Sequence, residues 1–301
     1  MQIDALKFAN AVDVNGPDLV PQVEQRMLAL TGSDQSQWPM ADAAAAKAAH
    51  YHIHSGGRRV RTRLALHTGR ALDLPEADVV ALAASVELLH NASLVHDDLQ
   101  DRDRTRRGME TVWSVFGENV AVCTGDLLLS AAYASLASFS ISHAIPKLMK
   151  LFHHRTCDLI HGQCEDLRMN AIQRDDFATY EMIAIGKSGS LFSLPLELAF
   201  VGAGLDAWAP QARKAANSFA LGYQILDDID DVEKDIVRTD KSHGLNAVLT
   251  LRAAGHGVDA EKMAHVISRK HLSEAAATAQ MLPSGAGQLL QDLALGLIID
   301  R

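Results

Sequence analysis

Two acidic clusters have the spacing best suited to chemistry. The first occupies residues 97–101 (DDLQD) and the second residues 227–231 (DDIDD). Side chains at positions i and i+4 of a helix lie on one face, about 6 Å apart, so Asp97 with Asp101, and Asp227 with Asp231, can each share a cation. Oxygen ligands without His or Cys favour Mg²⁺, with Mn²⁺ as the alternative, and Mg²⁺ is usually held by carboxylates together with substrate phosphates. The clusters therefore predict a phosphorylated ligand.

The alternative interpretation of one such cluster is a solvated helix end. Apolar residues immediately precede both clusters, at 94–95 and 225–226, so both helices leave the core where the carboxylates begin. The repulsion between like charges at this spacing then requires a compensating cation. A calcium-binding EF-hand does not fit the first cluster, because Arg106 stands where the loop needs its sixth-position glycine. We expect two metal-binding aspartate pairs that could face one another.

Arginines surround the first acidic cluster on both sides in the sequence. Four of them follow a Gly-Gly pair at 56–57, and four more follow Asp101. Arginine guanidinium groups match phosphate oxygens in pairs. The chain as a whole has 28 basic and 37 acidic residues, a net charge of −9, which disfavours nucleic acid as a partner. We predict local phosphate sites and no nucleic-acid binding.

The remaining sequence favours helices throughout. Residues 76–145 and 211–282 contain no proline, and aromatic residues make up only 5% of the chain. No alternation of strands and helices is present, so the sequence predicts one all-α domain over residues 1–301. The uncharged stretch 127–146 contains several serines and a histidine, which predicts a buried helix and no membrane span. The helices that we expect cover about 76–101, 117–143, 146–169, 174–185, 187–202 and 212–231.

Three cysteines without a CxxC pair predict a reducing, cytoplasmic location. The first residues carry acidic groups and no basic region before an apolar run, so a signal peptide is not expected.

The motifs, taken in order, resemble those of the trans-isoprenyl diphosphate synthases, the polyprenyl synthetase family. They are GGRRVR at 56–61, His90 followed by HDDLQD at 96–101, RRG at 106–108, GD at 125–126, GKS at 186–188 and YQILDD at 223–228. The motif-bearing core covers about 56–250. The resemblance implies a helical bundle of the isoprenoid synthase type around a deep central pocket, a homodimer, and Mg²⁺-dependent head-to-tail transfer of an allylic prenyl group to isopentenyl diphosphate.

The resemblance also implies roles for single residues. It implies that three Mg²⁺ ions bind the allylic diphosphate and that the carboxylates of Asp98 and Asp228 support the metal ligands. The metal ligands it implies are Asp97, Asp101, Asp227 and Asp231. The diphosphate of isopentenyl diphosphate would be held by Arg58, Arg61, His90 and Arg107. The allylic diphosphate would be held by Arg106, Lys187 and Lys241, with Ser188 and Gln224 stabilising the allylic cation. The residues assigned to catalysis are Asp97, Asp98, Asp101, Lys187, Gln224, Asp227 and Asp228.

Product length is expected to follow from Ala92 and Ser93, just before the first cluster. Both are small where bulky aromatics stop chain growth early in the family, so we predict C20 (geranylgeranyl diphosphate) or longer products. The alternatives are a farnesyl diphosphate synthase, a class I terpene cyclase, and a non-catalytic partner subunit of a heteromeric synthase. A segment at 235–246 that is shorter than usual favours the partner subunit mildly. The other departures from the family pattern are Arg58 for Lys, Thr62 for Pro, Ser188 for Thr and Tyr223 for Phe.

Overall fold

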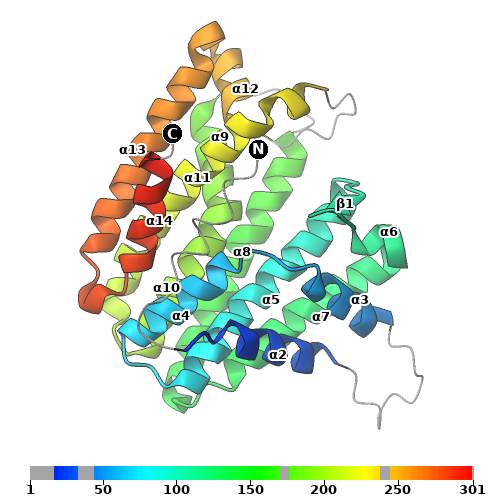
Figure 1. Cartoon of the computed structure of the whole chain (residues 1–301), viewed down its shortest axis with the longest axis vertical. Helices are drawn as coiled ribbons and strands as arrows, with labels where there is room; N and C mark the ends of the chain where they lie inside the picture. Colours follow the sequence, from blue (N-terminus) through cyan, green and yellow to red (C-terminus); the bar gives the residue numbers. More distant parts are fainter. Residues whose placement is uncertain (1–16, 33–43, 170–175, 238–244, 300–301) are drawn as a thin grey trace. The chain divides into compact units, whose positions relative to one another are not determined.

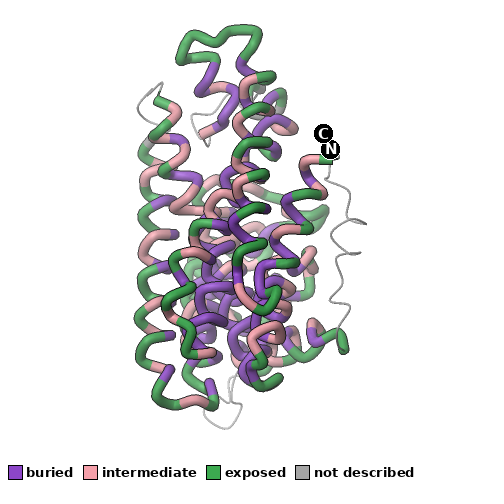
Figure 2. Tube along the Cα trace, turned by 90° about the vertical axis from the view of Figure 1, so that its left-hand side faces the viewer, coloured by how far each residue is buried: buried purple, intermediate pink, exposed green. Residues whose placement is uncertain are grey.

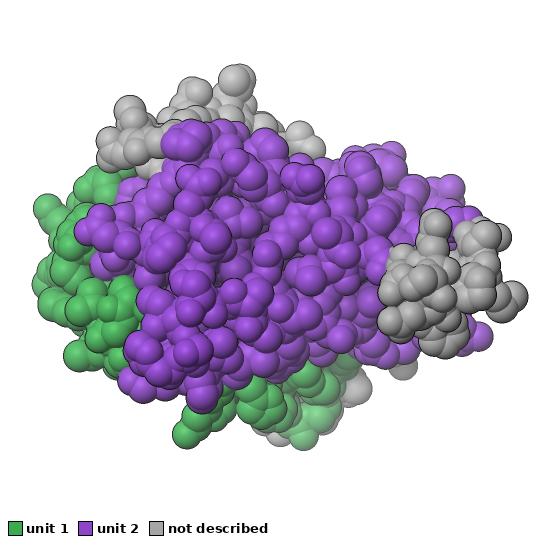
Figure 3. Space-filling view, turned by 90° about the horizontal axis from the view of Figure 1, so that it is seen from below, with its two compact units in different colours: residues 1–12, 150–301 green, residues 13–149 purple. Residues whose placement is uncertain are grey.

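The computed structural model describes residues 17–32, 44–169, 176–237 and 245–299 (Figure 1). Its described residues form two compact units, which Figure 3 distinguishes by colour: unit 2 ends at Met149, and unit 1 runs from Lys150 onward. Apart from two strands of two residues each, the regular elements of the described residues are helical. The predicted all-α class is therefore confirmed, while the single domain over 1–301 and the central pocket stay predictions.

Unit 2 contains the N-terminal helices and a short hairpin. Its elements are α2 (Val20–Thr31), α3 (Ala44–His54), α4 (Val60–Ala71), α5 (Glu76–Gln100), β1 (Thr105–Arg106), β2 (Met109–Glu110), α6 (Val112–Phe116), α7 (Glu118–Ala137) and the short η1 (Ser142–Ala144).

Unit 1 contains the rest of the chain, and α8 (Ile145–Met169) starts five residues before it. Its other elements are α9 (Phe177–Ala184), η2 (Ile185–Gly189), α10 (Ser190–Gly202), η3 (Asp206–Trp208), α11 (Ala209–Val237), α12 (Ala247–Leu251), η4 (Arg252–His256), η5 (Gly257–Asp259), α13 (Ala260–Gln280), η6 (Pro283–Gly285) and α14 (Gln288–Ile299).

Helix α5 is the central helix of unit 2. It begins after Pro75, whose fixed φ suits a helix start, and acidic Glu76 and Asp78 lie in its first turn, where they complement the helix dipole. Residues 81–89 are buried on every side, and burial lessens only toward the last turns. The helix therefore carries Asp97 and Asp101 out of the core, as the sequence predicted, while Asp98 between them stays buried. Buried and exposed positions alternate along most of the other long helices, as amphipathic helices require, whereas α10 is buried throughout (Figure 2).

The buried helix predicted for residues 127–146 is wrong in extent and in burial. Helix α7 ends at Ala137, and only 44% of its most apolar window is buried. Beyond the end of the helix, the buried carboxylate of Asp78 accepts hydrogen bonds from the backbone N and the hydroxyl of Ser140, at 2.7 and 2.6 Å. One side of α7 is exposed, with Val122 45% exposed.

Two helices among the described residues, α5 and α7, are long and apolar enough to cross a membrane. The most apolar window of α5 is 78% buried within the protein, as in the core helix of a soluble protein. That length and composition are weak evidence, and the absence of a membrane span stays a prediction.

The hairpin of β1 and β2 was not predicted. Its register pairs Thr105 with Glu110 and Arg106 with Met109, which leaves Arg107 and Gly108 as the two turn residues. Both have positive φ, 53° and 80°, as a two-residue type I′ turn requires. The hairpin carries two of the predicted phosphate-binding arginines, Arg106 in β1 and Arg107 in the turn, and Arg106 contacts Asp98 of the first acidic cluster.

Candidate functional site

The first aspartate motif lies on the last turn of α5. Asp97 and Asp101 are both half-buried, and the backbone N of Asp101 donates to the carbonyl oxygen of Asp97 at 2.8 Å. The two residues therefore stand one helical turn apart, as predicted. This spacing suits two carboxylates that share one ion.

Asp98, between them, is buried and pairs with an arginine. Nε and Nη2 of Arg106 both reach Oδ1 of Asp98, at 2.8 and 2.6 Å. Burial raises the pKa of Asp98 in spite of this arginine, and the hydrogen bond and charge of Asp98 raise the pKa of Arg106 against the effect of its own burial. The pair fixes the hairpin to the end of α5, so Asp98 supports the motif from inside.

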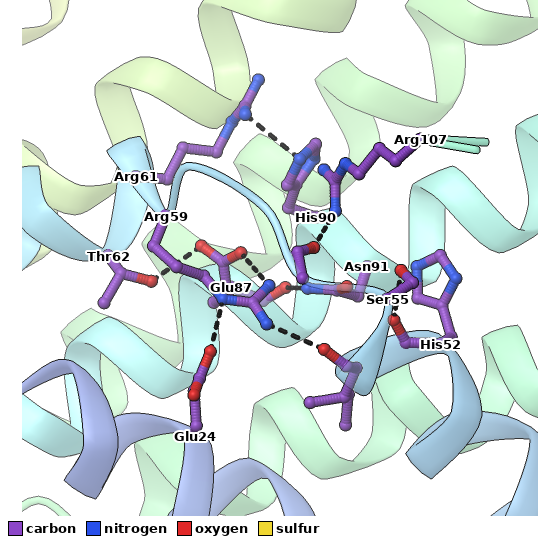
Figure 4. A network of polar contacts seen from close by, with 12 residues as sticks. Glu24, His52, Ser55, Arg59, Arg61, Thr62, Glu87, His90, Asn91 and Arg107 are labelled. Atoms are coloured by element: carbon purple, nitrogen blue, oxygen red, sulfur yellow. Dashed lines mark hydrogen bonds and ion pairs between the residues drawn. The ribbon is translucent and has the colours of Figure 1, made fainter. Parts of the chain in front are cut away.

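The remaining predicted phosphate-binding residues of unit 2 lie in the loop before α4 (Arg58), on α4 (Arg61), on α5 (His90) and in the hairpin turn (Arg107), and we call these four residues the arginine cluster. Nη1 of Arg61 lies 3.2 Å from Nε2 of His90, and Arg107 donates to the carbonyl oxygen of Gly56. A side chain at Gly57 would meet Nη1 of Arg107 at 2.7 Å, so only glycine fits there. Figure 4 shows Arg61, His90 and Arg107 pointing toward one another.

The electrostatics of this cluster favour an anionic ligand. Burial, followed by the charges of Arg61 and Arg107, lowers the pKa of His90 well below its usual value. Burial and the charges of Arg106 and Arg59 lower the pKa of Arg107. Nδ1 of His90 is buried and makes no hydrogen bond with the described residues. A bound diphosphate would offset this concentration of positive charge.

The glycine of the GD motif serves packing. A side chain at Gly125 on α7 would lie 2.1 Å from Nε2 of His96, so the absence of one lets α7 approach α5 beside the aspartate motif. Asp126 lies 3.8 Å from the same histidine nitrogen.

The second aspartate motif lies on α11 in unit 1. Asp227 is exposed, Asp231 is half-buried, and Asp228 between them is buried. The carboxylate of Asp228 accepts from the Tyr180 hydroxyl at 2.7 Å, from Nε2 of Gln224 at 2.9 Å and from the backbone N of Ala247 at 2.8 Å. Burial raises the pKa of Asp228 to about 7, against the effect of these donors.

Lys187 and Ser188 belong to a π-helical turn, η2, that leads into α10. Such turns are frequent at functional sites because they redirect side chains within a helix. A side chain at Gly162 on α8 would meet the backbone N of Lys187 at 2.7 Å, so α8 and η2 pack glycine against backbone. Lys187 forms an ion pair with Asp166, and Ser188 donates to Oε1 of Gln224 at 3.0 Å.

These unit 1 residues line a small cavity of about 60 Å³. Its lining includes Asp166, Tyr180, Lys187, Ser188, Gln224 and Leu245. Lys241, predicted to bind the allylic diphosphate, lies outside the described residues, as does most of the shortened segment. The structure thus brings Lys187, Ser188, Gln224 and Asp228 together within unit 1.

Several supporting residues escaped the sequence predictions of function. Asp166, Tyr180 and Asn246 contact the predicted site residues, and Asn246 donates to the carbonyl oxygen of Asp228 at 2.8 Å while capping α12. In unit 2 the missed residues are Arg59 and Glu87. Glu87 was the more visible of the two, since it is a lone charge within the apolar run 79–95.

The donor sets fit Mg²⁺ held jointly with a ligand. Among the described residues no three His, Cys, Asp or Glu side chains come together closely enough to hold a metal by themselves. Each motif instead offers carboxylates one helical turn apart, and Mg²⁺ is typically bound by one or two carboxylates plus substrate phosphates. These residues therefore fit the predicted ion.

Comparison with known proteins shows the family. The model of the polyprenyl synthetase family matches residues 42–281, and the chain belongs to that family. It is 34% identical over 216 residues to the heterodimeric geranylgeranyl pyrophosphate synthase large subunit 1 of Arabidopsis thaliana, and 32% identical over 213 residues to a geranylgeranyl pyrophosphate synthase of Capsicum annuum. Both matches cover 67% of this chain, and they span only 58% and 57% of the two plant proteins.

Solved structures show the same fold. The geranylgeranyl pyrophosphate synthetase of Pyrococcus horikoshii superposes with a TM-score of 0.81 at 21% identity, covering 97% of this chain and 98% of that one. An isoprenoid synthase family member from Thermotoga neapolitana gives a TM-score of 0.75 at 26% identity, covering 92% and 97%. The isoprenoid synthase fold predicted from the motifs is confirmed.

Proposed function

We propose that this protein is an Mg²⁺-dependent trans-prenyltransferase that joins isopentenyl diphosphate to an allylic prenyl diphosphate, head to tail. The observation that carries the proposal is the arginine cluster beside the first aspartate motif within unit 2. A terpene cyclase needs one diphosphate site, whereas this chain has an arginine cluster in addition to the metal-binding aspartates. The cluster is a suitable site for the diphosphate of isopentenyl diphosphate.

The allylic diphosphate is assigned to the aspartates and the cations near them. Asp97, Asp101, Asp227 and Asp231 would hold the Mg²⁺ ions. When bound, Mg²⁺ neutralises the charge that develops on the departing diphosphate. Arg106 and Lys187 add positive charge for the same group, and Asp98 and Asp166 keep them oriented.

The reaction then breaks the allylic carbon–oxygen bond and forms one carbon–carbon bond. The Ser188 hydroxyl and the Gln224 amide, joined by their hydrogen bond, present oxygen dipoles that stabilise the allylic cation. The double bond of isopentenyl diphosphate attacks that cation through C4, which leaves a cation at C3, and the released diphosphate accepts the proton lost from C2 as the new double bond forms. No protein base is required.

We propose products of C20 or longer. Ala92 is buried and small, and Ser93 uses its hydroxyl to donate to the carbonyl oxygen of His90 at 2.9 Å, so neither fills space one turn before the aspartates. The named relatives from Arabidopsis and Capsicum are geranylgeranyl pyrophosphate synthases, which supports the same length. Ala92→Phe should shift the products toward C15, as read by mass, and an unchanged product profile would refute this assignment of length.

The test of the activity is incorporation of radiolabelled isopentenyl diphosphate into acid-labile products. We expect incorporation with dimethylallyl, geranyl or farnesyl diphosphate and Mg²⁺, and loss of it with excess EDTA. Activity that appears only on addition of a second synthase chain would favour a partner subunit, and incorporation unaffected by EDTA would refute the metal-dependent mechanism.

We also propose a cytoplasmic homodimer. The exposed side of α7 supplies an apolar surface for a second copy, and the three cysteines are unpaired thiols, which suits a reducing compartment. Light scattering should give twice the chain mass of 32.5 kDa, and a monomeric mass would overturn the dimer. Fluorescent-fusion imaging in the source cells should give diffuse cytoplasmic signal.

A further inference from the structure

A buried polar network lies beneath the loop at 56–59, which precedes α4 and carries Arg58 of the arginine cluster (Figure 4). Arg59 is only 6% exposed, and its guanidinium group reaches three different helices. Nε donates to Glu24 on α2 at 2.9 Å, Nη1 to Glu87 on α5 at 3.0 Å, and Nη2 to the carbonyl oxygen of Ile53 on α3 at 2.9 Å. Arg59 therefore links the loop to most of the surrounding unit, while its side chain faces away from solvent.

The backbone of Arg59 adopts a conformation that its residue type disfavours. Its φ and ψ are 51° and 34°, in the left-handed region, where a residue with a Cβ costs about 1 kcal/mol or more. Gly56 and Gly57, just before it, also have positive φ. Because the loop is held in a disfavoured geometry, the bonds of the Arg59 side chain are what keep it there.

Glu87 connects this network to the arginine cluster. Its second oxygen accepts from the Thr62 hydroxyl at 2.7 Å, so Arg59 and Thr62, one turn apart at the start of α4, bind the same carboxylate. One turn further along α5, His90 contacts Arg61. The first turn of α4, which carries Arg61, is thus fixed to α5 at two neighbouring points, and Arg58 directly precedes Arg59 in the loop.

Charge supports the same role. Glu24 and Glu87 offset the charge of Arg59 within the network. Thr62 stands where the family usually has proline, which has no hydroxyl, so this chain adds a hydrogen bond to Glu87 by that departure.

We propose that Arg59, Glu87 and Thr62 form a positioning network that sets the geometry of Arg58 and Arg61 for the diphosphate of isopentenyl diphosphate. The inference rests on the proposed function. Arg59 acts through its neighbours and does not contact the substrate. Its effect should therefore fall on the binding of one substrate and spare the other.

The test compares Arg59→Lys and Thr62→Val with a matched control in unit 1. Arg155 is 9% exposed and forms a two-bond ion pair with Glu197 at 2.7 and 2.9 Å, so Arg155→Lys disturbs an equivalent buried pair in the other unit. We expect Arg59→Lys to raise the KM for isopentenyl diphosphate about 10-fold and Thr62→Val about 3-fold, with kcat and the allylic KM within about 2-fold. Arg155→Lys should lower the stability to urea as much as Arg59→Lys does, without raising the KM for isopentenyl diphosphate.

A milder variant and a binding measurement keep the proposal testable if Arg59→Lys does not fold. Glu24→Gln removes a charge at a side chain that is 41% exposed, and calorimetry with isopentenyl diphosphate alone should show about 3-fold weaker binding. Folded variants with the wild-type affinity and KM for isopentenyl diphosphate would overturn the positioning role. So would an equal rise from Arg155→Lys. A wild-type protein that neither binds isopentenyl diphosphate nor incorporates it would instead refute the proposed function.

Discussion

The two aspartate motifs share one sequence pattern and have different support. In each, the second aspartate is buried between two carboxylates that are more accessible. Asp98 in unit 2 is paired with the guanidinium group of Arg106, whereas the hydrogen-bond donors to Asp228 among the described residues of unit 1 are neutral: a phenol, an amide and a backbone N–H. Burial raises the pKa of both residues, and it raises that of Asp228 to about 7.

This difference shows that the pattern specifies where carboxylates stand and leaves their electrostatic environment to the rest of the fold. A charged partner makes Asp98 dependent on its own ionisation, since a buried arginine needs its counter-charge. Neutral donors make Asp228 dependent on hydrogen-bond geometry, which a residue of the same shape can preserve. Substitutions at both motifs, and the pH dependence of stability in unit 2, can test this contrast.

The largest effect is expected where the two motifs are alike. Asp97→Asn and Asp227→Asn each remove a carboxylate that we assign to Mg²⁺, and each should lower kcat about 10³-fold, because electrostatic stabilisation of the leaving group is lost. Initial rates at saturating Mg²⁺ measure this. Asp259→Asn, at an exposed aspartate 3.7 Å from Lys262, should keep the wild-type rate. A loss at only one motif would show that the other holds no metal.

The buried aspartates should separate the motifs in stability. Asp98→Asn leaves Arg106 without its counter-charge and should lower the free energy of unfolding by about 2 kcal/mol, a value reduced from that of a fully buried pair because Arg106 is 27% exposed. Asp228→Asn should cost about 1 kcal/mol or less, since the amide oxygen can accept from Tyr180 and Ala247 while the Gln224 amide rotates. Urea unfolding at pH 7.5 compares the two. Equal losses would contradict the contrast.

Deleting one neutral donor should have a smaller, measurable effect. Tyr180→Phe removes the hydroxyl that lies 2.7 Å from Asp228 and should lower the free energy of unfolding by about 1 kcal/mol. The matched control is Tyr51→Phe, whose hydroxyl donates to the carbonyl oxygen of Glu110 in an exposed setting and should cost less. If the control loses as much stability as Tyr180→Phe, the buried hydrogen bond has no special weight.

The positive charge of unit 2 should also appear in the pH dependence of stability. Burial, followed by the charges of Arg106, Arg107 and Arg59, lowers the pKa of His52 to about 3. His52 therefore takes up a proton near pH 6.5 in the unfolded chain and stays neutral in the folded chain. The contribution of neutral His52 to the free energy of unfolding is fully present above pH 6.5 and is lost as the pH drops toward 3. Between pH 7 and pH 5.5, His52→Gln should remove about 1 kcal/mol of this loss. An equal change in the free energy of unfolding between pH 7 and pH 5.5 for the wild type and His52→Gln would contradict this prediction.

Much of the frame could be predicted from the sequence. The helix from Glu76 and the helix bearing Asp227 follow from proline position and apolar spacing, and the aspartate pairs follow from their i, i+4 separation. The contacts that distinguish the motifs could not be predicted. Asp98 meets Arg106 across a reversal of the chain between the end of α5 and β1, and Asp228 meets Tyr180 from 48 residues away.

The same limit applies to the burial of α7 and to the arginine loop. Apolar composition predicted a buried helix at 127–146, but α7 ends at Ala137 with one side exposed, and the Asp78 carboxylate holds Ser140 beyond that end. Arg59 lies among arginines of similar sequence context, and only its left-handed backbone turns its side chain inward. Such choices depend on tertiary contacts that local patterns do not encode.

The most direct test of the central claim is a mass spectrum of the products formed from geranyl diphosphate, isopentenyl diphosphate and Mg²⁺. The account predicts linear prenyl diphosphates separated by one C5 unit, reaching C20 or beyond, and their disappearance with EDTA. Cyclised hydrocarbons formed without C5 addition, or no product from the folded chain, would contradict it.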